Sequence, residues 1–79
     1  MKTNTPEYRN MVKRANIYNE ARKALTLLRQ VQNNVEAIHK NALLPIDTDI
    51  TITMRSELMA VEMRLENLVR KYNPNKIEP

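Results

Sequence analysis

The chain has 79 residues, no cysteine, no glycine and a formal net charge of +4. The absence of cysteine excludes disulfides, zinc-thiolate sites and thiol nucleophiles, and the absence of glycine excludes the standard phosphate-binding loops and nucleophile elbows. A domain this small buries a limited fraction of its surface and is marginally stable as a monomer. We therefore expect the protein to gain stability as a homo-oligomer.

The positive charge lies in the first half of the chain. Residues 1–40 carry eight Lys or Arg against three acids, and residues 41–79 carry five against six. No apolar run approaches the roughly 18 residues that span a membrane. The first residues, MKTNTPEYRNMVKR, lack the apolar core of a signal peptide. We expect a cytoplasmic protein with no membrane partner, in the host cytoplasm if the protein is viral.

The first predicted helix covers about residues 6–43. Thr5 suits the N-cap and Pro6 the first helical position. Pro45 disfavours a helical backbone at Leu44 and should end the helix. Apolar residues in this helix step by four and three, which is the heptad pattern of a coiled coil. They are Ile17, Ala21, Ala24, Leu28, Val31, Val35, Ile38 and Ala42.

The stretch LPIDTDITIT, residues 44–53, has two interpretations. Its proline and its Asp-Thr-Asp cluster suit a hinge at residues 44–50 that ends one helix and caps the next. The Ile-Thr alternation at 50–53 is typical of a strand, which would have to pair with another chain as in a ribbon-type DNA-binding protein. In a ribbon–helix–helix protein the strand precedes two helices, whereas here a long helix comes first. We therefore favour the hinge.

The second predicted helix covers about residues 51–73 and is followed by a frayed tail at 74–79. Two heptad helices joined by a short connection pack antiparallel. The fold prediction is thus one all-α domain over residues 1–79, a helical hairpin that assembles into a dimeric or tetrameric bundle. The predicted self-association seam comprises Leu28, Val31, Val35, Ile38, Met54, Leu58, Val61, Leu65, Leu68 and Tyr72.

Two further apolar groups suggest contact with a partner protein. At roughly 1.5 Å per residue the first helix is longer than the second. About its first 15 residues should therefore extend beyond the end of the second helix as an overhang. A second subunit or a partner protein would cover this overhang, unless the chain folds back near residues 16–19. The methionine-containing group on the second helix suits an adaptable binding surface, or simply the wide face of a helix buried in a four-helix bundle. The predicted partner-binding residues are Tyr8, Met11, Val12, Tyr18, Ile52, Met59 and Met63.

Catalytic and metal-binding patterns are weak. Glu36 and His39 have the Glu-x-x-His spacing of di-iron bundles, but the glutamates of the second helix lie outside its heptad seam. In an antiparallel hairpin, residue 39 could approach residues in the early fifties, including the neighbourhood of Ser56. No glycine-rich turn is available to build an oxyanion hole there. We expect no enzymatic activity, metal, cofactor or small-molecule substrate.

Nucleic acid is the alternative partner. The basic residues Arg9, Lys13, Arg14, Arg22 and Lys23 alternate with tyrosines in the first half of the first helix. They surround the helix rather than gathering on one face, which is more typical of a solvated surface. The leading hypothesis is a non-enzymatic protein–protein interaction module with a regulatory or adaptor role, of a composition that would suit a small phage or mobile-element protein. The alternative is a small nucleic-acid-binding regulator.

Overall fold

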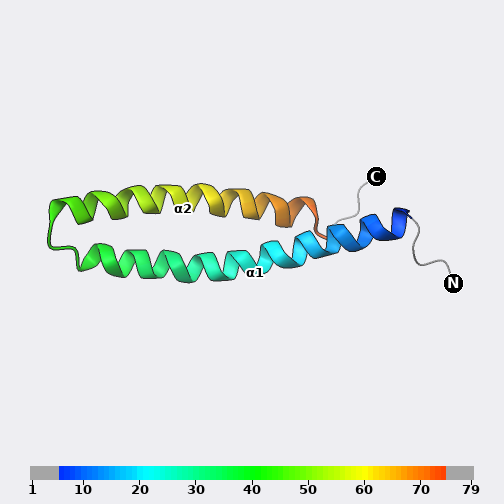
Figure 1. The fold of residues 1–79 in the computed structure, drawn as a ribbon, viewed down its shortest axis with the longest axis horizontal. Helices are drawn as coiled ribbons and strands as arrows, with labels where there is room; N and C mark the ends of the chain where they lie inside the picture. Colours follow the sequence, from blue (N-terminus) through cyan, green and yellow to red (C-terminus); the bar gives the residue numbers. More distant parts are fainter. Residues whose placement is uncertain (1–5, 75–79) are drawn as a thin grey trace.

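The computed structural model describes residues 6–74 and consists of two long helices, α1 (Pro6–Lys40) and α2 (Pro45–Lys71). The helices lie side by side and run in opposite directions, joined by residues 41–44, as Figure 1 shows. The predicted all-α antiparallel hairpin is therefore confirmed. The Ile-Thr alternation at 50–53 lies inside α2, so the strand interpretation is wrong. The predicted N-cap Thr5 and the tail beyond Pro74 lie outside the described residues.

The hinge is shorter than the predicted 44–50, because Pro45 begins α2 and does not merely end α1. At the first position of a helix the missing proline N–H costs nothing, and the fixed φ angle suits the helix. Leu44 is extended, with φ −106° and ψ 144°, as residues before proline prefer. Asp47 lies in the first turn, where the helix dipole favours an acid. The predicted capping by the Asp-Thr-Asp cluster does not occur, since the N-cap is Leu44 and has no side-chain hydrogen bond.

The face of α1 that packs on α2 differs from the predicted seam at every second position. Val35 is 2% exposed, whereas Val31 is 44% exposed and Ile38 is 53% exposed. The covered positions of α1 include Tyr18, Ala21, Leu25, Leu28, Gln32, Val35 and His39, and Ala42 continues the series in the hinge. The covered positions of α2 include Thr51, Met54, Leu58, Glu62, Leu65, Val69 and Tyr72. Both series step by three and four, as heptad packing requires. Each helix is rotated, however, so that polar residues take some of the interface positions predicted for apolar ones.

The hairpin is long and has a thin core. Its Cα radius of gyration is 18.2 Å, against about 12 Å for a compact chain of this length. Among residues 6–74, the buried apolar side chains are Ala21, Leu25 and Val35. Within this part of the chain, neither helix has the length and apolar character required to cross a bilayer. Most of the large apolar side chains therefore remain on the surface of a single copy.

Candidate interaction surfaces

Polar side chains pair across the interface between α1 and α2. Nδ1 of His39 lies 2.7 Å from Oγ1 of Thr51, and Nε2 of Gln32 donates to Oε1 of Glu62 at 3.2 Å. The first contact confirms the expectation that residue 39 approaches the early fifties. Sequence reasoning missed the second, because apolar periodicity gives no signal for a hydrogen-bonded Gln–Glu pair. These pairs occupy interface positions that apolar residues would otherwise fill.

One flank of the hairpin, which we call the polar flank, carries ion pairs between the helices. Arg29 lies 3.7 Å from carboxylate oxygens of both Glu62 and Glu66, and Nε of Arg55 lies 2.6 Å from Glu36. Arg29, Glu36 and Glu66 each follow directly after an interface residue in the chain. Exposed ion pairs of this kind add little stability. They show that charged groups on this side of the hairpin pair between the two helices, while Ile52 and Met59, which also follow interface residues, stay exposed.

The opposite flank, the apolar flank, comprises the residues that directly precede every second interface position. On α1 they are Ile17, Ala24, Val31 and Ile38, and on α2 they are Val61 and Leu68; Met54, a half-buried interface residue, continues the seven-residue spacing at the hinge end. Because successive helical residues turn by about 100°, residues before and after an interface position lie on opposite sides of the helix. Ile17, Val31, Ile38, Val61 and Leu68 remain more than a third exposed. Thus Val31, Ile38, Val61 and Leu68 of the predicted seam form an uncovered stripe, while Leu28, Val35, Leu58 and Leu65 hold the hairpin together.

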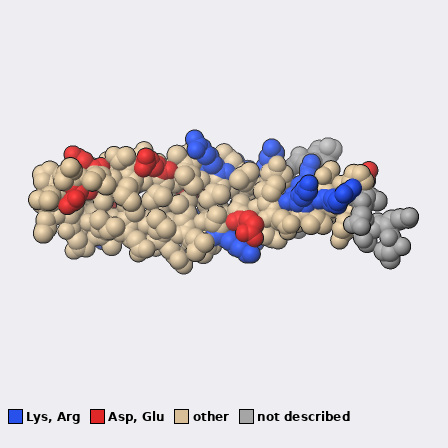
Figure 2. Space-filling view, in the orientation of Figure 1, with Lys and Arg blue, Asp and Glu red and all other residues tan. Residues whose placement is uncertain are grey.

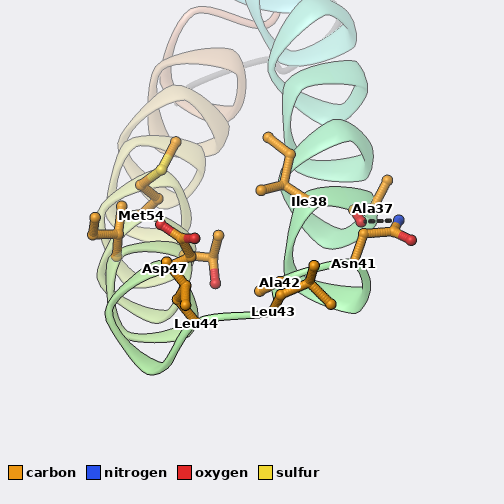
Figure 3. Close-up of a pocket in the computed structure, with 10 residues that line it drawn as sticks. Ala37, Ile38, Asn41, Ala42, Leu43, Leu44, Asp47 and Met54 are labelled. Atoms are coloured by element: carbon orange, nitrogen blue, oxygen red, sulfur yellow. Dashed lines mark hydrogen bonds between the residues drawn. The ribbon is translucent and has the colours of Figure 1, made fainter.

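The apolar flank widens into an open groove at the hinge. The groove has a volume of about 640 Å³ and includes Ile38 on α1 and Met54 on α2. These two side chains point toward each other across the space between the helices in Figure 3. Leu43 and Leu44 lie at its hinge end, where Leu43 is 93% exposed. The groove shows that the apolar stripes of the two helices share one side of the hairpin.

The predicted partner-binding residues fall into separate places. Tyr8, Met11 and Val12 are exposed on the first turns of α1, whereas Tyr18 is half-buried. Met11 and Tyr72 line the same groove, so less of α1 overhangs the end of α2 than the predicted 15 residues. α2 begins at Pro45 rather than near residue 51, and it ends at Lys71. The remaining three residues, Ile52, Met59 and Met63, are exposed and stand outside the apolar flank.

The basic residues gather at the end of the molecule that holds the termini. Arg9, Lys13 and Arg14 are exposed on α1, and Arg14 shares a groove with Lys71 of α2. Figure 2 shows Lys and Arg side chains toward this end, while the coloured residues in view at the hinge end are acidic. The structure therefore adds α2 cations to the basic group that the sequence placed on α1 alone.

Two of the predicted nucleic-acid contacts have partners within α1. The guanidinium of Arg22 lies 5.6 Å from the ring centroid of Tyr18 and donates to its hydroxyl at 3.5 Å. Lys23 forms an ion pair with Glu20 at 3.2 Å. Both cations stay exposed, so these contacts reduce but do not remove their availability to a phosphate.

The Glu-x-x-His pair belongs to the hairpin interface. Glu36 pairs with Arg55, and His39 pairs with Thr51 rather than with Ser56. In the part of the chain that the structure describes, no three His, Cys, Asp or Glu residues come together in a way that could hold a metal ion. These two side chains thus have structural partners that account for their positions.

No protein-family model matches the chain, and neither the curated proteins nor the solved structures include a significant match.

Proposed function

We propose that this chain is a non-enzymatic protein–protein interaction module that associates with itself through the apolar flank. The observation that carries the proposal is the uncovered stripe at Ile17, Val31, Ile38, Val61 and Leu68. Exposed apolar side chains that gather along one side of a protein are typical of an interaction site. The seven-residue spacing of the stripe suits packing against a second pair of helices in a four-helix bundle.

The contacts inside the hairpin support the same proposal. The polar flank already carries ion pairs to Arg29 and Arg55, and the interface holds the Thr51 and Glu62 pairs. Within residues 6–74, the hydrogen bonds and ion pairs that join the two helices lie in the interface and on the polar flank, and the apolar flank carries none of them. A second copy that covers the apolar flank would bury apolar surface that the thin core leaves exposed, and this burial would stabilise the fold. A regulatory or adaptor role follows from a module whose surface binds proteins.

Sedimentation velocity over a range of micromolar concentrations tests the proposal. We expect a dimer or tetramer, and Val61→Lys should shift the distribution toward monomer because it places a charge in the apolar interface. Met63→Lys is the matched control, since Met63 lies two residues away on the same helix, is exposed and stands outside the apolar flank. A stable monomer at tens of micromolar would remove the basis of the proposal.

Nucleic-acid binding is the second candidate, favoured by the gathering of α1 and α2 cations at one end. Arg14 and Lys71 line one groove there, beside the ring of Tyr72. Phosphate contacts would make the affinity for DNA fall steeply with salt. A titration with a short duplex and a single-stranded oligonucleotide, from low to physiological salt, measures this slope. Absence of binding at low salt would dismiss the candidate.

A further inference from the structure

We propose that the occupant of the apolar flank is a second copy in the reverse orientation, so that each hinge lies beside the other copy's open end. By open end we mean the end that carries the termini. This inference rests on the proposed self-association and adds the direction of the partner. Three features of the described residues carry it: the distribution of charge, the spacing of the apolar stripe and the position of the hinge groove.

The charge of the hairpin is divided between its ends. The hinge end, residues 30–60, carries the acids Glu36, Asp47, Asp49 and Glu57 against Lys40 and Arg55, a net charge of −2. The rest of the described chain, residues 6–29 and 61–74, carries nine Lys or Arg against four acids, a net charge of +5. Two copies in the same direction would place like charges together at both ends. The reverse orientation places opposite charges together at both ends, which favours association and fixes direction.

The apolar stripe permits this reversal without loss of apolar contact. Its α1 members stand seven residues apart at 17, 24, 31 and 38. In a reversed copy Ile17 can face Ile38 of the other copy, and Ala24 can face Val31. The α2 residues at 54, 61 and 68 keep the same spacing. A stripe of equal steps packs equally well in either direction, so the charges of the two ends decide the orientation.

The hinge groove gains an occupant in the reversed arrangement. With Ile17 level with Ile38 of the other copy, residue 15 is level with Lys40, the last residue of that copy's α1, and residues 11 and 12 lie about one helical turn further, beside the hinge. The exposed Met11 and Val12 of one copy then lie near the apolar groove of the other, which is lined by Leu44 and Met54. Apolar side chains at the two extremes of the hairpin would thus be covered by the same contact. In the parallel arrangement each groove would face only the other groove.

Cross-linking between copies tests the orientation, because the native chain has no cysteine. Two single variants, Ile17→Cys and Ile38→Cys, are each treated with a bis-maleimide of about 10 Å reach, alone and as a mixture with a tag on one partner. Residues 17 and 38 are roughly 30 Å apart along a helix at 1.5 Å per residue, so the reagent cannot join them in an aligned parallel dimer. We expect the mixture to give a tagged–untagged cross-linked dimer and each variant alone to give none.

Sedimentation of the same samples separates the two proposals. If the Ile17→Cys variant alone gives a cross-linked dimer and the mixture gives no tagged–untagged product, the reversed orientation is overturned while self-association stands. A dimer that cross-links in no sample would also overturn it, since the copies would then meet outside the apolar flank. A monomer in every sample would overturn the proposed function itself.

Discussion

Thr51 and His39 illustrate how polar residues hold this hairpin together. The hydroxyl of Thr51 donates to the carbonyl of Thr48 at 2.8 Å and lies 2.7 Å from Nδ1 of His39. Because a hydroxyl has a single hydrogen, Nδ1 of His39 must be the donor in that second contact. Thr51 is 2% exposed, so both hydrogen bonds form in a largely dry environment. The contact with His39 connects the last turn of α1 to α2 near the hinge, and the bond to Thr48 lies within α2.

Replacement of Thr51 by valine tests this connection. Thr51→Val keeps the shape but removes both hydrogen bonds, and we expect a loss of about 1 kcal/mol in the free energy of unfolding. Thr53→Val is the control, because Thr53 is exposed on the same helix and undergoes the same chemical change. Urea denaturation at one fixed protein concentration measures both, since self-association also shifts stability. Equal effects of the two substitutions would mean that the His39 contact adds no stability.

At the scale of single residues, the sequence predicted proximity but not pairing. The antiparallel hairpin implied that residue 39 approaches the early fifties, and it does. The Gln32–Glu62 pair could not be predicted, because an apolar search favours Val31 over its neighbour Gln32. The polar interactions across the interface, Gln32 with Glu62 and His39 with Thr51, agree with the burial of Leu25 on which of the two adjacent stripes packs inward.

At the scale of the helix, α1 presents two overlapping heptad stripes. They share Ala21, Leu28 and Val35 and differ by one residue at the alternate positions. The sequence therefore predicted the two helices, their heptad spacing and their antiparallel packing. It did not predict which face of α1 packs on α2, because that depends on contacts between the two helices. The stripe that turned outward became the apolar flank.

Val31 and Val35 form a matched pair for this rotation. Val35→Ala removes a side chain that is 2% exposed, and we expect a loss of about 1.5–2 kcal/mol at about 0.8 kcal/mol per buried CH₂. Val31→Ala should change hairpin stability by well under half of that and weaken self-association instead. Both substitutions gain the same helix propensity, so the difference isolates burial. Chemical denaturation and sedimentation of both variants measure the two effects; equal losses of stability would contradict the observed packing.

The hinge shows why helix boundaries escaped prediction. A proline can end a helix or begin one, and here Pro45 begins α2 directly after a leucine N-cap. Leucine is a poor N-cap, because its side chain cannot accept a hydrogen bond from the exposed backbone amides. Its presence in the groove beside Ile38 and Met54 is better explained by an apolar contact than by helix capping.

A capping residue at this position should strengthen α2. Leu44→Ser is expected to raise the free energy of unfolding by about 1 kcal/mol, measured in a Val61→Lys background that removes self-association. Leu43→Ser, one residue earlier and outside the capping position, is the control and should have little effect. In the otherwise native chain Leu44→Ser should also weaken self-association, as the groove loses an apolar contact. An unchanged stability would indicate that the α2 N-terminus is already satisfied in another way.

At the scale of the whole molecule, folding rearranges the charge. The sequence places the excess of cations in its first half, but the hairpin brings Arg64, Arg70 and Lys71 of α2 beside the same end. The acids around the hinge are thereby left at the other end. This polarity could not be predicted from the two halves of the sequence, because it depends on where α2 begins and how far it reaches along α1.

Charge reversal tests whether this polarity orients the copies. Arg9→Glu with Lys13→Glu should weaken dimerisation about tenfold at low salt, or about 1.4 kcal/mol, because it changes the net charge of residues 6–14 from +2 to −2, and this segment would then repel the acidic hinge of a reversed copy. Asp49→Lys with Glu57→Lys should weaken it similarly by making the hinge basic. The four substitutions together should restore the native affinity, since residues 6–14 and the hinge end of the other copy would again carry opposite net charges, −2 and +2. Sedimentation at low salt measures all three variants.

Two other arrangements give different outcomes. A parallel dimer holds like ends together in the native chain and in the quadruple variant, so neither pair of reversals would weaken it and no rescue would be seen. A nucleic-acid contact through the basic end would be lost with Arg9→Glu and Lys13→Glu and would not return when the hinge becomes basic. At about 1 M salt the Debye length falls to about 3 Å, so the differences among the variants should shrink while the apolar contact persists. A reversed partner is required if each pair of substitutions weakens dimerisation, the four together restore it, and the affinities of the variants converge at high salt.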